Sequence, residues 1–304
     1  MAEIVKRYEK NPIISPSDIP DCEAVYNCGA VKFEGRYLLL LSVIRKRSES
    51  LKEIFVAEGM DGVHFTVREE PFFTPSKDGF WASLEYDVCD PRVTYLEGTY
   101  YITLPLHGPG YGVVGLLGKT TDFRKFERIE IIALPDNRVP VLFPERVAGE
   151  YVRLDRPFGL YPGSLWLSFS KDLIYWGRHR PLILPDKRHW CNLKVGPACP
   201  PIKTDKGWLL IYHAVSGLNI GSVAYYLGAA LLDLNDPLKI IGRTKGPILA
   251  PEEPYERIGR VNNVVFSCGA ITEDNGEVRI YYGAADLCVC LATTTVEALI
   301  DACC

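Results

Sequence analysis

The sequence predicts an all-β fold, a five-bladed β-propeller with a central active-site pocket, on the strength of three observations. A turn glycine followed by an aromatic-rich apolar strand occurs five times along the chain. Helical periodicity is weak almost everywhere, residues 295–302 being the exception. The 22 prolines and 26 glycines are scattered rather than clustered, which suits many short strands and turns.

The repeated unit is defined by its glycine, which stands at Gly35, Gly98, Gly149, Gly207 and Gly276. The spacings are 63, 51, 58 and 69 residues, and most units contain a second strand that ends in an acidic turn at Asp61, Asp122, Asp172 or Asp236. A repeat period indicates architecture more firmly than local propensity does, so we expect one four-stranded blade per unit. A single catalytic propeller domain would then cover residues 1–304, and the alternative is a pair of β-sandwiches whose strands resemble one another by accident.

Composition and charge argue against several classes of partner. The net charge is −4, without the basic excess of a nucleic-acid-binding protein. The N-terminus has no apolar signal core, and the longest apolar run, near residues 37–44, is far short of a membrane span. We therefore expect a cytoplasmic protein with neither a nucleic-acid nor a membrane partner. The sequence does not determine the oligomeric state and is compatible with a homo-oligomer.

The ten cysteines include no C-x-x-C pair, and the spacings at Cys288, Cys290 and Cys303-Cys304 fit neither zinc nor redox motifs. We predict reduced and mostly buried thiols. Histidine is scarce, and the sequence contains no phosphate-binding glycine loop and no His-Glu-x-x-His motif. We expect neither a metal nor a cofactor.

A candidate acid lies in the segment from Glu85 to Arg92, which contains three carboxylates and leads into an apolar strand. If this segment is extended, Asp90 and Arg92 point to the same face, and the arginine can orient and tune the carboxyl group as a general acid requires. The alternative is an Asp-Pro turn with a surface ion pair, which these residues taken alone favour.

Basic side chains stand at strand ends in several repeats and could converge on the pocket. They are Arg45, Arg47, Arg146, Arg156, Lys194 and His213. Converging arginine and lysine donors form an anion site, and the forked guanidinium suits phosphate. Each residue singly is more simply read as a solvated charge, and His213 as a core histidine.

Polar residues in two near-copies of a short motif suggest ligands for sugar hydroxyls. Asn27 begins Asn-Cys-Gly-Ala, and Asn263 precedes the strand that contains Ser-Cys-Gly-Ala, while Asp286 follows Tyr-Tyr-Gly-Ala-Ala. The alternative is that these side chains cap loops.

These motifs taken together resemble the mannoside phosphorylases of glycoside hydrolase family 130. The similar segments run in order over nearly the whole chain: Asn27-Cys-Gly-Ala, Asp90-Pro-Arg92, Leu142-Phe-Pro-Glu-Arg146, Lys194-Val-Gly, Trp208 to His213, Asn263-Val-Val-Phe and Tyr282 to Asp286. The resemblance implies a five-bladed propeller that cleaves β-mannosides with inversion, by phosphorolysis in most members and hydrolysis in some.

The resemblance also implies roles for individual residues. Asp90 would be the sole catalytic acid, while Arg156, Lys194, His213 and Tyr225 would bind phosphate, and Asn27, Arg92 and Asp286 would bind the mannosyl unit. Two positions depart from the family pattern. Cys89 precedes Asp90 where a glutamate is usual, and Ser42 stands where an arginine often ends the inner strand of the first blade. Arg45 and Arg47 lie just beyond it, and either could supply the missing cation.

Three functions are compatible with this pattern. The first is reversible phosphorolysis of β-1,2- or β-1,4-linked mannobiose or short mannooligosaccharides, with inorganic phosphate as co-substrate and α-mannose 1-phosphate as product. An inverting β-mannosidase would need a second carboxylate to activate water, whereas phosphate is already an anionic nucleophile. A non-catalytic carbohydrate-binding propeller would need no acid at Asp90.

Overall fold

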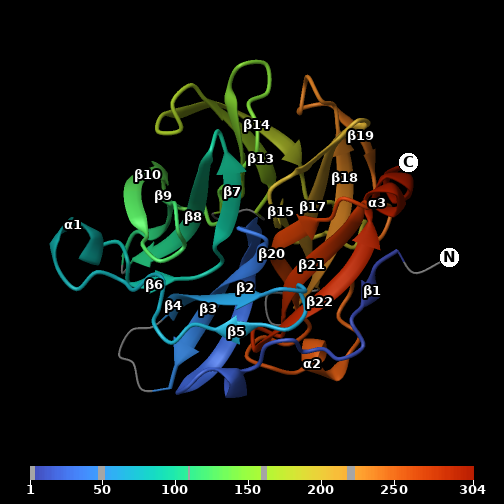
Figure 1. Cartoon of the computed structure of the whole chain (residues 1–304). Coiled ribbons are helices and arrows are strands. Elements are labelled where there is room, and N and C mark those ends of the chain that lie inside the picture. The colour runs from blue at the N-terminus through green and yellow to red at the C-terminus, as the bar shows by residue number, and fades with distance from the viewer. Residues whose placement is uncertain (1–3, 47–51, 109, 159–162, 218–222) are drawn as a thin grey trace.

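The computed structural model describes residues 4–46, 52–108, 110–158, 163–217 and 223–304. Five antiparallel sheets are arranged radially around an axis (Figure 1). The predicted propeller is therefore confirmed, and the alternative of paired sandwiches is wrong, because each repeat forms its own sheet instead of contributing strands to two shared ones.

The first three blades follow the order of the sequence. Blade 1 contains β2 (Cys22–Phe33), β3 (Arg36–Arg45), β4 (Lys52–Gly59) and β5 (Thr66–Val67). Blade 2 contains β6 (Asp87–Val88), β7 (Arg92–Leu96), β8 (Thr99–Gly108), β9 (Gly112–Thr120) and β10 (Glu127–Ala133). Blade 3 contains β11 (Val141–Leu142), β12 (Tyr151–Asp155), β13 (Leu165–Ser170) and β14 (Trp176–Ile183).

The last blade joins the two ends of the chain. Blade 4 contains β15 (Lys194–Pro197), β16 (Ile202–Thr204), β17 (Gly207–Gly217), β18 (Val223–Leu232) and β19 (Ile240–Arg243). Blade 5 contains β20 (Val265–Thr272), β21 (Glu277–Ala284) and β22 (Cys288–Thr295), and its outer strand is β1 (Lys6–Arg7) from the N-terminus. The pairing of β1 with β22 closes the ring of blades (Figure 1).

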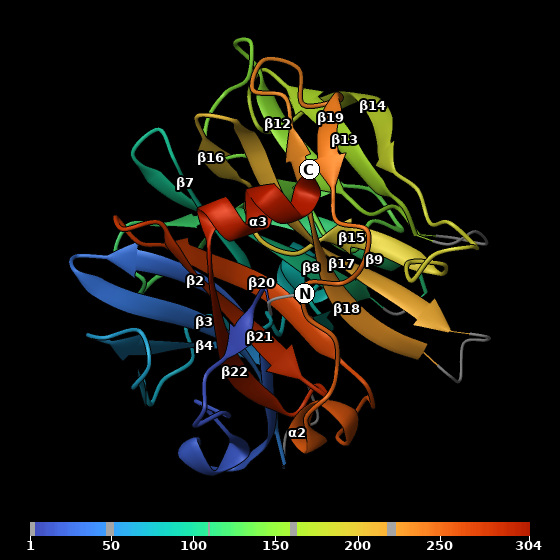
Figure 2. The same ribbon diagram turned by 90° about the vertical axis from the view of Figure 1, so that its right-hand side faces the viewer.

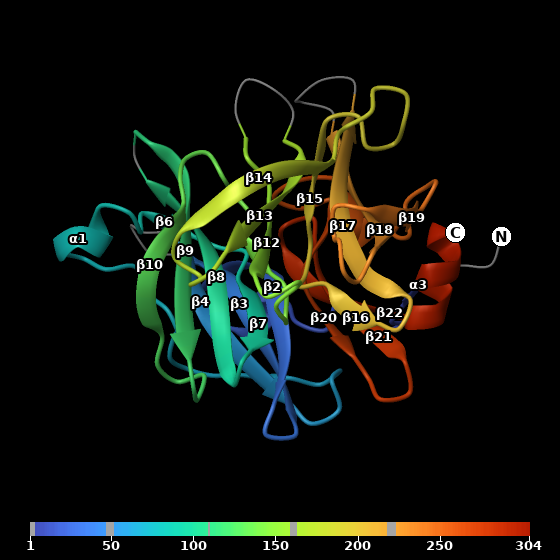
Figure 3. The same ribbon diagram turned by 90° about the horizontal axis from the view of Figure 1, so that it is seen from above.

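Helices are few and short. They are η1 (Pro16–Asp18), α1 (Gly79–Ala82), α2 (Pro254–Arg257) and α3 (Val296–Cys303). The hydroxyl of Thr295 caps α3 by accepting the N–H of Ala298 at 3.1 Å, which confirms the helix expected at the C-terminus. Leu299 and Ile300 bury α3 against blades 4 and 5 (Figure 2), and α1 lies on the opposite side of the molecule (Figure 3).

The repeat glycines occupy one structural position. Each stands at the tight turn that leads into the strand pairing with the innermost strand or strands of its blade, namely β3, β8, β12, β17 and β21, and all five have positive φ, between 74° and 151°, where a side chain would be strained. The acidic turns also have a common function. Asp61, Asp122 and Asp172 each accept two backbone N–H groups two and three residues ahead. In blade 4 this role belongs to Asp233 rather than to Asp236.

The hydrophobic core lies between blades, because successive side chains of a strand point to opposite faces. In β3, Leu38 and Leu40 pack toward blade 2, whereas Leu39 and Leu41 pack toward blade 5. Among the described residues, four of the interfaces hold 14 or more fully buried apolar side chains each, and the interface between blades 2 and 3 holds six. That interface is therefore the least filled of the five.

All ten cysteines are free thiols and nine are buried, as predicted from their spacing. Within the described ranges, no helix has the length and apolar character needed to cross a bilayer.

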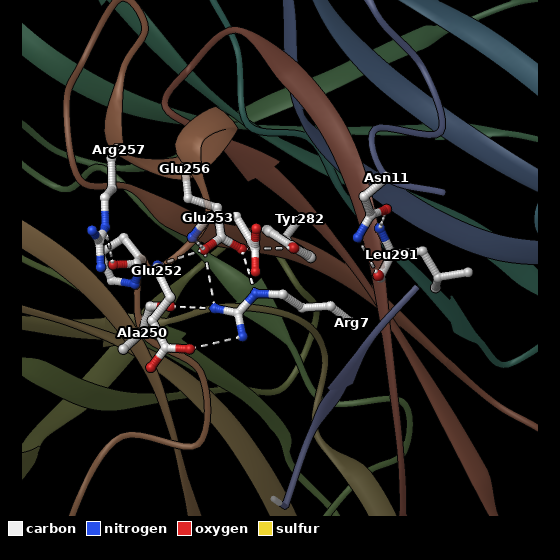
Figure 4. A network of polar contacts seen from close by, with 10 residues as sticks. Arg7, Asn11, Ala250, Glu252, Glu253, Glu256, Arg257, Tyr282 and Leu291 are labelled. Atoms are coloured by element: carbon white, nitrogen blue, oxygen red, sulfur yellow. Dashed lines mark hydrogen bonds and ion pairs between the residues drawn. The ribbon is translucent and has the colours of Figure 1, made fainter. Parts of the chain in front are cut away.

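A buried ion pair fixes the N-terminal strand at the closure of the ring (Figure 4). Arg7 donates to both carboxylate oxygens of Glu256, at 2.9 and 3.0 Å, and Glu256 is fully buried. The hydroxyl of Tyr282 and the backbone N–H groups of Glu252 and Glu253 donate to the same carboxylate. We call this cluster the closure network.

Candidate active site

One pocket is lined by residues from all five blades and therefore lies at their common axis. Its volume is about 210 Å³. Its polar lining comprises Asn27 of blade 1, Asp90 of blade 2, Arg138 and Arg156 of blade 3, Lys194 and Tyr225 of blade 4, and Asp286 of blade 5. We call it the axial pocket.

Asp90 is held from three sides. The side-chain amide of Asn27 donates to its carboxylate at 2.9 Å, the hydroxyl of Ser42 accepts its backbone N–H at 2.9 Å, and Arg92 donates to its carbonyl oxygen at 2.7 Å. These contacts stabilise a left-handed backbone conformation with φ of 52°. Such conformations cost free energy, and the surrounding bonds fix the carboxylate in one orientation.

The two departures from the family pattern lie directly beside Asp90. The Ser42 hydroxyl also donates to the carbonyl of Asn27 at 3.3 Å, so a small neutral group joins two pocket residues where the family often has an arginine. Cys89 is buried, and burial raises the pKa of its thiol to about 12, so it is uncharged. Both positions therefore support the pocket without adding charge to it.

Three cations gather in the axial pocket without a carboxylate partner. Among the described residues, Arg138, Arg156 and Lys194 form no ion pair within 4.0 Å. Burial and the repulsion of Arg138 lower the pKa of Arg156 to about 10, and burial with the repulsion of Arg156 lowers the pKa of Lys194. Uncompensated buried cations are costly, so this arrangement favours binding of an anion.

His213 orients one of these cations from behind the lining. Burial and the neighbouring Arg156 hold the pKa of His213 well below its usual range, so the imidazole is neutral. Its Nδ1 lies 3.1 Å from the Pro197 carbonyl and must carry the proton, so Nε2 accepts from Arg156 at 2.6 Å.

The two carboxylates of the pocket have opposite pKa shifts. Burial would raise the pKa of Asp90, but Arg92, Arg138 and the Asn27 hydrogen bond outweigh it and bring the pKa below its ordinary value. Burial, together with repulsion from Asp90, raises the pKa of Asp286 to about 6. In the empty pocket, Asp90 is therefore the more acidic of the two.

Some buried polar atoms around the pocket have no partner within the described chain. They are Asn27 Oδ1, Arg92 Nη2 and Arg156 Nε. Asn27 and Asp286 also adopt left-handed conformations, with φ of 43° and 49°. Unsatisfied polar atoms and local strain at one place are typical of a ligand-binding site.

The axial pocket brings together six of the residues predicted from the sequence: Asn27, Asp90, Arg156, Lys194, Tyr225 and Asp286. Arg92 and His213 are fully buried directly behind the lining. Asn263 is exposed, and its carbonyl accepts the backbone N–H of Tyr225, but its side chain does not line the pocket.

Of the two cations predicted from blade 1, Arg45 does not line the axial pocket. Arg45 points away from it and donates to the Pro20 carbonyl at 2.7 Å and to Glu53 at 3.3 Å, because the end of β3 lies against the loop before β2. Arg47 lies outside the described residues.

Arg138 is the residue that sequence reasoning missed. It directly precedes the apolar segment Val139-Pro-Val-Leu-Phe, so it is a charged residue at the start of an inner strand, which is the pattern that marks pocket residues in the other blades. Within the described residues, no cluster of three or more histidine, cysteine or acidic side chains is arranged to hold a metal ion.

The fold and the pocket define a carbohydrate-active enzyme of the propeller type. A family model described as beta-1,4-mannooligosaccharide phosphorylase matches residues 2–304, and the chain belongs to glycoside hydrolase family 130.

The chain is similar to several characterised proteins over most of their length. It is 33% identical to a beta-1,2-mannobiose phosphorylase of Listeria innocua, with 93% of each chain covered. It is 33% identical to a beta-1,4-mannooligosaccharide phosphorylase of Ruminococcus albus, covering 98% of this chain and 90% of that one. A solved structure of a Listeria innocua beta-1,2-mannobiose phosphorylase in complex with beta-1,2-mannobiose superposes with a TM-score of 0.89 at 31% identity, covering 98% of this chain and 99% of that one.

Proposed function

We propose that the axial pocket transfers the mannosyl unit of a β-mannoside to inorganic phosphate, releasing α-mannose 1-phosphate and a shortened sugar. The observation that carries this proposal is the group of three cations without a carboxylate partner among the described residues, in the same pocket as Asp90, whose carboxylate is held by Asn27. The relatives named above are phosphorylases of β-1,2- and β-1,4-mannosides, so both linkages are substrates to test.

The proposed reaction is an inverting displacement. Arg138, Arg156 and Lys194 hold phosphate, and one of its oxygens forms a bond to the anomeric carbon as the glycosidic C–O bond breaks. The proton of Asp90 passes to the departing sugar oxygen, so that no second carboxylate is needed. Asn27 and Asp286 bind the mannosyl hydroxyls, and the cation cluster aligns the nucleophile before the bond breaks.

Phosphate also prepares the acid. In the empty pocket Arg92 and Arg138 favour the ionised form of Asp90. Bound phosphate places negative charge against Arg138 and Arg156, which weakens their pull on Asp90 and raises the pKa of its carboxyl group. Bound phosphate therefore favours the protonated form of the acid.

Hydrolysis is the alternative, and Asp286 is the observation in its favour, because it is a second carboxylate in the same pocket. One assay separates the two reactions. The protein is incubated with β-1,2- and β-1,4-mannobiose with and without phosphate, and products are followed by proton and phosphorus NMR. We expect α-mannose 1-phosphate to appear only with phosphate, and mannose released at the same rate without phosphate would establish a hydrolase.

A substrate with an activated leaving group tests the role of Asp90. A dinitrophenolate leaves without protonation, so Asp90→Asn should lose roughly 10³-fold in kcat on mannobiose and retain most activity on dinitrophenyl β-mannoside. Asp286→Asn serves as the matched control and should lose activity on both substrates, because it removes a sugar contact. An equal loss on both substrates for Asp90→Asn would remove it from the role of acid.

A further inference from the structure

A second cavity, of about 430 Å³, lies between blades 2 and 3. It is bounded by the end of β10 and the segment that follows it on one side, and by β12, β13 and β14 on the other. This is the interface with the smallest apolar core among the described residues. We call it the inter-blade cavity, and its size is within the range of small-ligand sites.

The walls of the inter-blade cavity combine aromatic and polar side chains. Trp166 and Trp176 are partly exposed and supply broad apolar surfaces. The guanidinium of the buried Arg153 lies 4.4 Å from the Trp176 ring and fixes that indole in place. Rigid indole faces suit the C–H face of a pyranose ring.

The hydrogen bonds of the polar wall determine which of its atoms donate and which accept. The carboxylate of Asp155 accepts the Asn137 amide at 2.8 Å and the Ser168 hydroxyl at 2.5 Å. Ser168 has a single proton, which it gives to Asp155, so the contact of 2.8 Å between Ser168 and His179 requires His179 Nδ1 to be the donor. In the tautomer that carries its one proton on Nδ1, Nε2 is an acceptor.

A further acceptor is available at Asp136. One of its carboxylate oxygens accepts the N–H of Val113 at 2.7 Å, and the other has no hydrogen-bond partner among the described residues. Acceptors at Asp136 and His179 beside two indoles match the hydroxyl groups and the apolar face of a hexose.

A single layer of backbone separates the inter-blade cavity from the axial pocket. Asn137 and Asp155 line the inter-blade cavity, and the residues that follow them, Arg138 and Arg156, line the axial pocket. Asn137 Oδ1 accepts the backbone N–H of Arg156 at 3.1 Å. A ligand in the cavity would therefore contact the layer that positions two of the three cations.

We propose that the inter-blade cavity is a second carbohydrate site, which binds one hexopyranose unit of a β-mannoside without cleaving it. The choice of a mannoside rests on the proposed function. The site itself rests on the paired indoles, the fixed acceptors and the sparse core between blades 2 and 3.

Indole NMR signals test this site in the full chain. The sequence has five tryptophans, and each side-chain N–H gives one signal. Titration with β-1,2- or β-1,4-mannobiose in phosphate-free buffer should shift the signals of Trp166 and Trp176 and leave that of the buried Trp208 unmoved. The proposal is overturned if the Trp166 and Trp176 signals stay fixed at tens of millimolar sugar. Phosphorolysis is measured separately and tests the proposed function of the axial pocket. The NMR titration tests the inter-blade cavity, so each proposal can fail without the other.

Substitutions of residues that line the inter-blade cavity test where the sugar binds. Trp166→Ala, and the milder His179→Ala at an exposed position, should weaken the sugar-induced shift of Trp176 by at least fivefold and leave kcat/KM for mannobiose within twofold. Tyr175→Ala is the matched control, because Tyr175 is 80% exposed, adjoins Trp176 and does not line the cavity. Unchanged binding in both cavity variants, or an equal loss in Tyr175→Ala, would overturn the proposal.

Discussion

The closure network and the axial pocket are both clusters of buried charges, and they differ in how completely these charges are paired. The Glu256 carboxylate of the closure network accepts five hydrogen bonds, from Arg7 twice, from Tyr282, and from two backbone N–H groups (Figure 4). In the axial pocket, Arg138, Arg156 and Lys194 have no carboxylate partner within the described chain, and Asn27 and Arg92 each leave a polar atom unbonded.

This difference separates structural charges from functional ones. A buried charged group whose hydrogen-bonding positions are all occupied holds elements together and has few positions available for a ligand. A buried charge that lacks partners costs stability, and the chain recovers that free energy only when a ligand binds. Mutations in the two clusters should therefore have opposite consequences for stability and activity.

The largest expected effect is on the stability of the closure network. Glu256→Gln removes the fully buried counter-ion of Arg7 and leaves the largely exposed Glu252 as its acidic neighbour, and we expect a loss of roughly 3 kcal/mol in the free energy of unfolding. Chemical denaturation measures it, and kcat should stay within twofold of wild type. The matched control is Glu252→Gln, whose side chain is 63% exposed and should matter little. A loss of activity without a loss of stability would contradict the structural role.

A smaller effect is expected from a cation of the axial pocket. Lys194→Ala removes one of three groups that attract phosphate, and we expect the KM for phosphate to rise by roughly 10- to 100-fold, or about 1.4–2.7 kcal/mol. Steady-state kinetics with each substrate varied in turn should show little change in the KM for mannoside. Lys203→Ala, at an exposed lysine paired with Glu145, is the control. An equal rise in both KM values would count against a phosphate role for Lys194.

The smallest effect concerns pH. The folded pKa of Asp286 is about 6, above the unfolded value of about 3.9, so the folded chain holds this proton more tightly. The resulting stabilisation is complete below pH 4 and is lost as the pH rises through 6. Asp286→Asn mimics the protonated form, so it should be more stable than wild type by roughly 1–2 kcal/mol at pH 7.5 and nearly equal to it at pH 4.5. A difference of the same size at both pH values would show that ionisation is not its cause.

Much of the fold could be predicted from the sequence because a requirement of the backbone conformation produces the repeated glycine. A tight turn with positive φ selects glycine where the chain enters the strand that pairs with the inner strand of every blade, and the aromatic strand after it has to fill two blade interfaces. The closure by β1 could not be predicted. Lys6 and Arg7 form a two-residue strand, too short to leave a hydrophobic pattern.

The site was predictable where a polar residue stands at or near the end of an apolar strand, and less so elsewhere. Asp90, Lys194 and Asp286 stand out in this way. Arg138 follows Pro135-Asp-Asn, which reads as a surface turn, and this turn obscures the signal of the apolar segment after it; the structure places Arg138 beside Arg156 in the pocket. Arg45 has the right residue type in the right blade, but whether a long side chain turns toward the axis or toward Pro20 depends on tertiary contacts.

Closure of the ring by β1 has to wait until β22 has been synthesised. The N-terminal strand is synthesised first, yet its partner β22 lies within the last twenty residues of the chain. The pocket takes groups from every blade, with Asp286 emerging from the ribosome near the end. A nascent chain that carries blades 1 to 4 therefore has Asp90 and the three cations of the axial pocket but lacks Asp286, and its N-terminal strand has no β22 to pair with.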